Sequence, residues 1–190
     1  MKRRLLNKKV LAIIILLGSA VVVFLVFRGA EIKQQAVDFA MRKGGYYFNG
    51  GAYDLKSAER WYRAALWLNP SMPLAHYQLS RIYLVEGRSG EALVAVNKEL
   101  ELRPGSGRAY YMRGLIDGFS KNLDSAEADF KKILELGRLD EYAESLGQSG
   151  WAVYNDLSWV QFQKGEYRDV EKTARAGLGN GDAALFGDGA

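Results

Sequence analysis

The sequence offers few side chains that could perform chemistry, and none of them stands in a recognisable catalytic arrangement. The chain has 190 residues, a single histidine, His76, and no cysteine. Cysteine nucleophiles, disulfides and thiolate metal sites are therefore excluded, and one histidine cannot by itself supply a histidine-rich metal site. Most catalysis needs an activated nucleophile or a positioned acid–base pair. We expect His76 to be a packing residue, and we predict a chain that is not an enzyme and has no catalytic, metal-binding or cofactor-binding residue.

Two glycine-containing segments could suggest ligand binding, but their spacing does not support it. Residues 43–53, KGGYYFNGGAY, contain paired glycines without the Lys-Ser/Thr ending of a phosphate-binding loop. Residues 179–190, GNGDAALFGDGA, alternate glycine and aspartate as calcium-binding arrays do, but only in one irregular copy. We expect turns around an aromatic plug in the first segment and a flexible Gly-rich tail in the second.

The charges of the chain are unevenly distributed, and this distribution bears on possible partners. Residues 1–28 contain six of the 26 Lys and Arg and none of the 22 Asp and Glu, which leaves 20 basic and 22 acidic residues in the rest. A protein that binds nucleic acid needs a basic face to displace counterions from phosphates. We therefore predict that nucleic acid is not a partner.

An apolar run occupies residues 10–27, VLAIIILLGSAVVVFLVF, and contains no charged residue. As a helix it would span about 27 Å, close to the ~30 Å hydrocarbon core of a bilayer. The basic segment 1–9 precedes it, so the positive-inside rule places the N-terminus in the cytoplasm. We predict a single-pass transmembrane anchor at 10–28 with the rest of the chain outside the cytoplasm. A signal peptide cleaved after Ala20 is the alternative, and a buried core helix is the third, less favoured because the run has no polar face.

Small and apolar residues recur every 34 residues in the remainder of the chain. Ala58, Ala92 and Ala126 share this spacing. The same 34-residue spacing relates the large residues Tyr62, Val96 and Phe130, and the leucines of 66–68, 100–102 and 134–136. Within each unit the apolar positions follow helical periodicity, interrupted by a Gly-containing turn. A fixed period of this length is typical of stacked helical hairpins.

These positions resemble the tetratricopeptide repeat (TPR) family, and specifically its membrane-anchored bacterial-type members. Residues 73–106 carry Leu79, Tyr83, Gly87, Ala92 and Pro104 at the family's signature positions. The resemblance implies an all-α, right-handed α-solenoid of about four TPR helix hairpins after the transmembrane helix. The solenoid would cover 31–178, with repeats at about 31–72, 73–106, 107–140 and 151–178. The first helix of the first repeat is expected at 31–43, followed by an unusually long loop.

Two irregularities of the array could have functional meaning. The fourth repeat follows an insertion at 138–150, which we interpret as a spacer, with a partner-contacting element as the alternative. A solenoid normally ends in a helix with a polar outer face, and only Leu185 and Phe186 could cover the end of the fourth repeat. A possible homo-oligomer through this uncapped C-terminal repeat follows.

The family's concave groove is lined by the first helices of successive repeats, so the resemblance implies a protein or peptide partner there. Carried onto this sequence, the groove positions are rich in aromatic side chains with a few polar ones, a mixture common at binding hot spots. A shift of one residue in helix register would instead place some of them in the core. The predicted partner-binding residues are Tyr77, Arg81, Arg108, Tyr111, Phe119, Asn155, Trp159 and Phe162. Tyr77 and Arg81 replace the Lys and Asn with which chaperone-tail-binding members clamp a carboxylate, so that function is not implied.

The sequence thus favours a membrane-tethered TPR interaction module or scaffold in the cell membrane, with its repeats outside the cytoplasm. One alternative is a structural subunit that assembles with copies of itself into an oligomer or fibre. Another is an accessory subunit of an envelope assembly or polysaccharide machine. No cofactor is expected in any of these cases.

Overall fold

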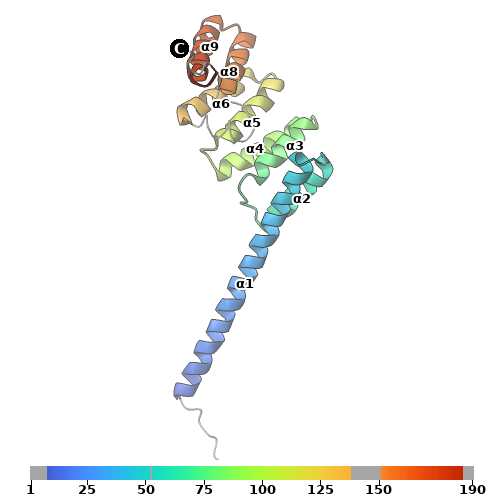
Figure 1. The fold of residues 1–190 in the computed structure, drawn as a ribbon, viewed down its shortest axis with the longest axis vertical. Helices are drawn as coiled ribbons and strands as arrows, with labels where there is room; N and C mark the ends of the chain where they lie inside the picture. Colours follow the sequence, from blue (N-terminus) through green and yellow to red (C-terminus); the bar gives the residue numbers. More distant parts are fainter. Residues whose placement is uncertain (1–7, 52, 138–150, 186–190) are drawn as a thin grey trace, which may run out of the picture.

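The structure is a computed structural model that describes residues 8–51, 53–137 and 151–185, with side chains from about residue 24 to residue 179. This part of the chain contains eight α-helices and no strand (Figure 1). The helices are α1 (Lys8–Asn49), α2 (Leu55–Leu68), α3 (Ala75–Val85), α4 (Ser89–Leu102), α5 (Gly107–Phe119), α6 (Leu123–Leu136), α8 (Trp151–Lys164) and α9 (Tyr167–Leu185). The predicted all-helical, TPR solenoid-like fold is confirmed.

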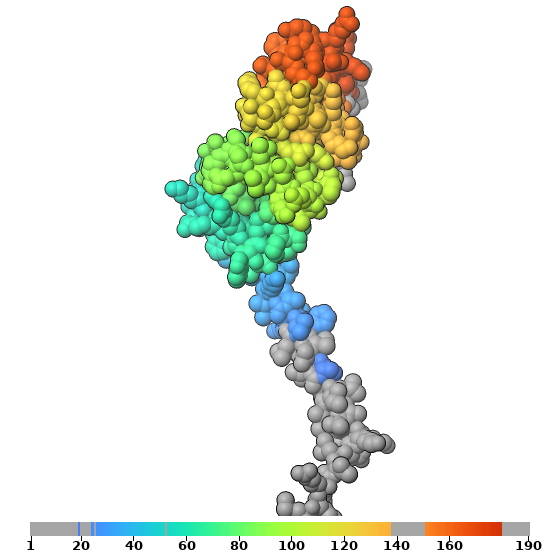
Figure 2. Space-filling view, turned by 180° about the vertical axis from the view of Figure 1, so that it is seen from behind, coloured from blue at the N-terminus to red at the C-terminus, as the bar shows by residue number. Residues whose placement is uncertain are grey.

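The helices pair as four hairpins that follow one another along the molecule. Hairpin 1 is the C-terminal half of α1 with α2, hairpin 2 is α3 with α4, hairpin 3 is α5 with α6, and hairpin 4 is α8 with α9. Each hairpin contacts the next in chain order, as the stacked bodies in Figure 2 show. The contacts are therefore mostly local in sequence, which is why a short recurring pattern can specify the whole array.

Small residues let the two helices of each hairpin approach closely. Ala58, Ala92 and Ala126, which share the 34-residue spacing, are each 0% exposed. At Gly114 of α5, a Cβ atom would stand only 2.8 Å from the ring of Phe130 in α6. The recurring small residues are thus needed because a larger side chain would force the paired helices apart.

The turn inside hairpins 2, 3 and 4 has the same backbone geometry each time. Gly87, Lys121 and Gly165 have positive φ angles of 73°, 64° and 81°. In each turn the next amide donates to a carbonyl five residues earlier, from Arg88 to Tyr83 (2.8 Å), from Asn122 to Asp117 (2.8 Å) and from Glu166 to Gln161 (2.9 Å). This left-handed helix end favours glycine, so Lys121 occupies a position that costs a side chain about 1 kcal/mol.

Helix α1 differs from the prediction for the first repeat. A helix over 31–43 followed by a long loop was expected, but α1 continues to Asn49 and the reversal occupies only residues 50–54. Val37, Ala40, Gly44 and Phe48 lie on one face of α1 and are buried inside hairpin 1, where α1 packs on α2. A Cβ atom at Gly44 would come within 2.7 Å of the Tyr62 ring. Gly44 therefore allows close helix packing and does not form the expected turn, and tertiary contact outweighs its low helix propensity. Gly50 and Gly51 do lie in the reversal after α1, as expected.

The C-terminal segment also differs from the prediction. Residues 179–190 were expected to form a flexible tail, but α9 extends to Leu185. Residues 186–190 lie outside the described part of the chain, as do the predicted insertion at 138–150 and residues 1–7 of the basic segment. Where its side chains are described, α9 is largely exposed, and among the described helices it packs mainly against α8.

Over the residues described, no helix satisfies the length and hydropathy criteria for crossing a membrane. Most side chains of the predicted anchor at 10–28 lie outside the described part of the chain, although its backbone belongs to α1 from Lys8 onward.

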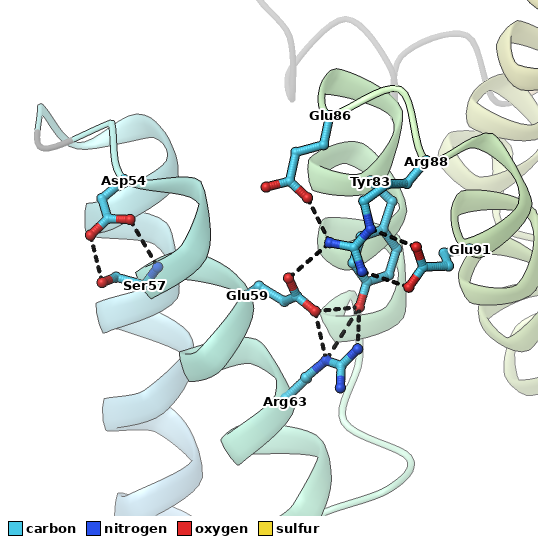
Figure 3. A network of polar contacts seen from close by, with 8 residues as sticks. All are labelled: Asp54, Ser57, Glu59, Arg63, Tyr83, Glu86, Arg88 and Glu91. Carbon is cyan, nitrogen blue, oxygen red and sulfur yellow. Dashed lines mark hydrogen bonds and ion pairs between the residues drawn. The ribbon is translucent and has the colours of Figure 1, made fainter.

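Polar side chains join each hairpin to the next. Between hairpins 1 and 2, Glu59 of α2 accepts hydrogen bonds from Arg88 (3.1 Å) and from the Tyr83 hydroxyl (3.0 Å) (Figure 3). Between hairpins 2 and 3, Arg113 of α5 donates to Asn97 of α4 (2.9 Å). These bridges lie beside the apolar core and fix how one hairpin is set against its neighbour.

The third junction depends on a buried carboxylate. Glu127 of α6 is 6% exposed and accepts from Lys164 (2.5 Å) and Gln161 (3.3 Å), both at the end of α8. Lys131 forms a further ion pair with Glu127 at 2.6 Å. Burial tends to raise the pKa of Glu127, but its bonds with Lys131, Lys164 and Gln161 outweigh burial and lower the pKa to about 2. Glu127 is therefore ionised and held between α6 and α8 at neutral pH.

Candidate binding site

A pocket of about 280 Å³ lies between α5 and α8, the first helices of hairpins 3 and 4. Its floor includes the ring of Phe130 from α6. The remaining lining comes from two helix faces: Gly114, Leu115, Gly118 and Phe119 on α5, and Asn155, Asp156, Trp159 and Val160 on α8. Helices α5 and α8 are adjacent in the stack (Figure 1), and α6, between them in sequence, packs against both.

Two glycines one helical turn apart create the open space on the α5 side. Gly114 and Gly118 share a face because residues four apart in a helix lie above one another. Neither presents a side chain, so the backbone of α5 forms this wall of the pocket. A Cβ atom at Gly118 would stand 3.6 Å from the Trp159 ring, an ordinary contact distance. The Trp159 ring therefore faces the open backbone of α5 across the pocket, with room for one further methyl group at Gly118.

Aromatic side chains form the rim. Phe119 is 67% exposed and Trp159 is 41% exposed, so both rings present apolar area to solvent beside the pocket. The Lys121 ammonium lies 5.4 Å from the centre of the Trp159 ring, within cation–π range. The rim can thus contact both apolar groups and cations.

One carboxylate lies in the pocket wall. Asp156 accepts a short hydrogen bond from the Tyr111 hydroxyl through Oδ2 and a 3.4 Å bond from the Asn155 amide through Oδ1. Burial raises the pKa of Asp156, and the two hydrogen bonds oppose this without cancelling it. Among the residues that the structure describes, no cation forms an ion pair with Asp156. The pocket therefore combines an apolar rim with a half-buried acidic group.

The structure places the eight predicted groove residues in four environments: in the pocket, half-buried outside it, exposed outside it, and in the core. Phe119, Asn155 and Trp159 come together in the pocket. Arg81 is half-buried, donates to Gln78 (2.9 Å) and lies 4.6 Å from the ring centre of Phe48. Arg108 is half-buried at the start of α5, and Phe162 is 55% exposed with its ring 5.8 Å from that of Tyr167.

The structure places two of the predicted groove residues, Tyr77 and Tyr111, in the core. They are 2% and 3% exposed, and the ring centres of Tyr111 and Phe130 lie 5.6 Å apart in the core. Neither presents its ring to the groove surface, because a rotation of one residue, about 100° around a helix, converts a groove position into a core position. Tyr111 still reaches the pocket indirectly, through its hydrogen bond to Asp156. The partner role predicted for the set as a whole stays a prediction.

Sequence reasoning missed the group with the most distinctive chemistry, Asp156. Only its neighbour Asn155 was among the predicted groove residues. The spacing of Gly114 and Gly118 is a signal that could have indicated an open helix face. The location of a carboxylate beside it requires the packing of α8 against α6, which a single-helix pattern does not contain.

His76 is half-buried, as expected for a packing residue. Burial lowers its pKa, and a hydrogen bond with the Pro70 backbone works in the opposite direction. Within the described residues no group of acidic or histidine side chains could hold a metal ion.

Comparison with known proteins supports the repeat assignment. The tetratricopeptide repeat family model matches residues 107–137, which are α5 and α6. No curated protein matches the chain in sequence. The family resemblance thus has direct sequence support in hairpin 3, and the other hairpins share its geometry.

Solved structures of TPR proteins have a similar fold. MamA from Desulfovibrio magneticus is 17% identical, with a TM-score of 0.66 over 78% of this chain and 77% of that chain. The first TPR of Spaghetti (RPAP3), bound to an HSP90 peptide, is 20% identical, with a TM-score of 0.58 over 69% of this chain and 94% of that chain. YrrB, described as a TPR protein with an unusual peptide-binding site, is 17% identical, with a TM-score of 0.61 over 76% of this chain and 69% of that chain. At these identities the likeness concerns the fold.

Proposed function

We propose that this chain is a protein–protein interaction module that holds a segment of a partner protein against α5 and α8. The observation that carries the proposal is the pocket between α5 and α8, with Phe119 and Trp159 exposed beside it. Exposed aromatic side chains beside a cavity are typical binding hot spots. Two structures with a similar fold are described as peptide-bound or peptide-binding, which supports the same use here.

Photo-crosslinking in the native membrane preparation tests this proposal. A photoreactive residue at Phe119 is expected to crosslink one defined protein, and the crosslink should disappear when Trp159→Ala is added. The matched control places the same photoreactive residue at Trp67, which is 83% exposed on α2 and lies outside the pocket. Identical products from both positions, or a product unaffected by Trp159→Ala, would exclude the pocket as the contact site.

We further propose that residues 10–27 anchor the module in the cell membrane, with the repeats outside the cytoplasm. The support is the uncharged run of the sequence and the basic residues that precede it. Protein that stays in the membrane fraction at alkaline pH and is digested by protease added to sealed spheroplasts would agree with this topology. An N-terminus that begins at residue 21 would instead show cleavage of a signal peptide.

Self-assembly is a second candidate function because large apolar side chains of α9 are exposed among the described residues. Tyr167 and Leu178 on α9 are 66% and 65% exposed, in the place where a further hairpin would pack in a longer array. Light scattering of the full chain in detergent distinguishes self-assembly from a module that stays monomeric. A mass that rises with concentration and falls on Leu178→Glu would support self-assembly, and a constant monomer would contradict it.

The prediction that the chain is not an enzyme stays a prediction. An accessory role in an envelope assembly or polysaccharide machine is compatible with an interaction module and would be decided by the identity of the crosslinked partner.

A further inference from the structure

The pocket between α5 and α8 contains an acidic group, Asp156, that has no cationic partner among the described residues. Two buried carboxylates near this junction have cationic partners: Asp129 binds Arg113 at 2.7 Å and Glu127 binds Lys164 at 2.5 Å. Asp156 instead has only the neutral donors Tyr111 and Asn155 among the described residues. Since an ionised carboxylate can accept about four hydrogen bonds, it has capacity for another donor.

The walls around this carboxylate suit a long side chain. The open backbone at Gly114 and Gly118 leaves room beside Leu115 and Val160, so an aliphatic stem can be covered on several sides. Phe119 and Trp159 stand at the entrance, where ring faces attract a cation or a guanidinium plane. The chain itself demonstrates this attraction, because the Lys121 ammonium already lies 5.4 Å from the Trp159 ring centre.

We propose that the pocket binds the side chain of an arginine or lysine from the partner protein, with the cationic head between Asp156 and the Trp159 ring and the stem along the open backbone of α5. This rests on the proposed interaction function and names the chemistry that the module recognises. Charge complementarity carries it: the wall offers one carboxylate without a cation, and the rim offers aromatic faces. Arginine is expected to bind more tightly than lysine, because its planar group can stack on Trp159 while donating to Asp156.

The position of Lys121 sets a limit on the affinity. It is exposed at the rim and repels an incoming cation, but water and salt screen a charge at that position. Arg81 and Arg108 are the cationic groups of the predicted groove that lie outside the pocket, on α3 and at the start of α5. An acidic peptide would be attracted to those arginines and not to the pocket, and this gives the test a clear contrary outcome.

The test uses the full chain in detergent, labelled with 5-fluorotryptophan and followed by fluorine NMR. Its four tryptophans give separate signals, and Trp159→Phe identifies that of Trp159. The probes are acetylated and amidated hexapeptides that differ at one position: arginine, its neutral isostere citrulline, norleucine or glutamate. We expect the arginine peptide to shift the Trp159 signal and to bind at least about tenfold more tightly than the citrulline peptide, a ratio that falls at high salt.

Two variants separate the carboxylate from the fold. Asp156→Asn keeps the shape and should bind the arginine and citrulline peptides equally, whereas Tyr111→Phe removes only the neutral donor and should keep the preference. Equal binding of arginine and citrulline by the unmodified chain, preference for glutamate, or no peptide-dependent shift would each overturn the proposal. If the Phe119 crosslink to the natural partner is lost with Trp159→Ala but unchanged with Asp156→Asn, the interaction function stands and the inference of a basic residue fails.

Discussion

The ion pairs of Glu127 should make the junction between hairpins 3 and 4 sensitive to acid, and Glu127→Gln tests this directly. The folded chain lowers the pKa of Glu127 from its ordinary 4.5 to about 2. At about 1.36 kcal/mol for each pH unit, the ionised form contributes about 3 kcal/mol at neutral pH. Because the folded pKa is depressed, this contribution is present above pH 4.5 and is lost as the pH falls towards 2.

The glutamine variant should remove most of that contribution without leaving a stranded charge. Lys164 keeps Asp124 at 2.8 Å and Glu166 at 2.9 Å, and the amide can still bond Gln161. We therefore expect a loss of about 2–3 kcal/mol at pH 7, measured as the free energy of opening of α8 by hydrogen exchange. Global melting is less suitable, since terminal repeats of a solenoid can open separately.

The matched control is Glu135→Gln on the same helix. Glu135 pairs with Lys132 at 2.9 Å, but its side chain is 65% exposed, so its removal should cost less than about 0.5 kcal/mol. The difference between the two variants should shrink as the pH is lowered from 5 to about 2. A Glu127→Gln variant that opens like the unmodified chain at pH 7, or that shows the same loss at pH 3 as at pH 7, would refute the reasoning.

Three further predictions concern the turns and the pocket. Gly114→Ala should lower the free energy of unfolding in urea by about 1–2 kcal/mol, because the added Cβ meets the buried Phe130 ring at 2.8 Å. The control Gly90→Ala, whose Cβ has no atom within 4 Å, should leave this free energy unchanged or raise it. Lys121→Gly should raise stability in urea by up to about 1 kcal/mol, since it relieves a positive φ of 64°; an unchanged midpoint would mean that the lysine is not strained there. Burial raises the pKa of Asp156, so the free energy of unfolding should gain a favourable contribution from Asp156 as the pH falls through that pKa. Asp156→Asn should remove this pH-dependent contribution. A variant whose stability depends on pH as that of the unmodified chain does would contradict the prediction.

The residues that stack one hairpin on the next could be predicted from sequence because their role depends on local geometry. Ala58, Ala92 and Ala126 recur at a fixed spacing and are all fully buried, since every hairpin needs the same close crossing. Gly87 and Gly165 mark the turns for the same reason. The all-helical class and the pairing of helices followed directly from this pattern.

The groove residues could be predicted only in part, because exposure depends on rotation about each helix axis. Phe119 and Trp159 were correctly placed at the surface, whereas Tyr77 and Tyr111 point into the core. The extension of α1 through Gly44 could not be expected from helix propensity, which disfavours paired glycines. It becomes understandable once the ring of Tyr62 is seen against the glycine, a contact between helices that no local pattern records.

Helix α1 enters hairpin 1 without a break, and this sets the orientation of the pocket. Residues 26–35 are exposed on all sides, with Arg28 and Glu31 paired at 3.5 Å, yet the helix continues through them. Such a connection acts as a rigid shaft rather than a tether. Each residue inserted there would rotate the pocket by about 100° and move it by about 1.5 Å relative to the segment before it, while seven residues would restore the angle to within about 20°. The number of residues in α1 therefore determines the direction in which the pocket faces.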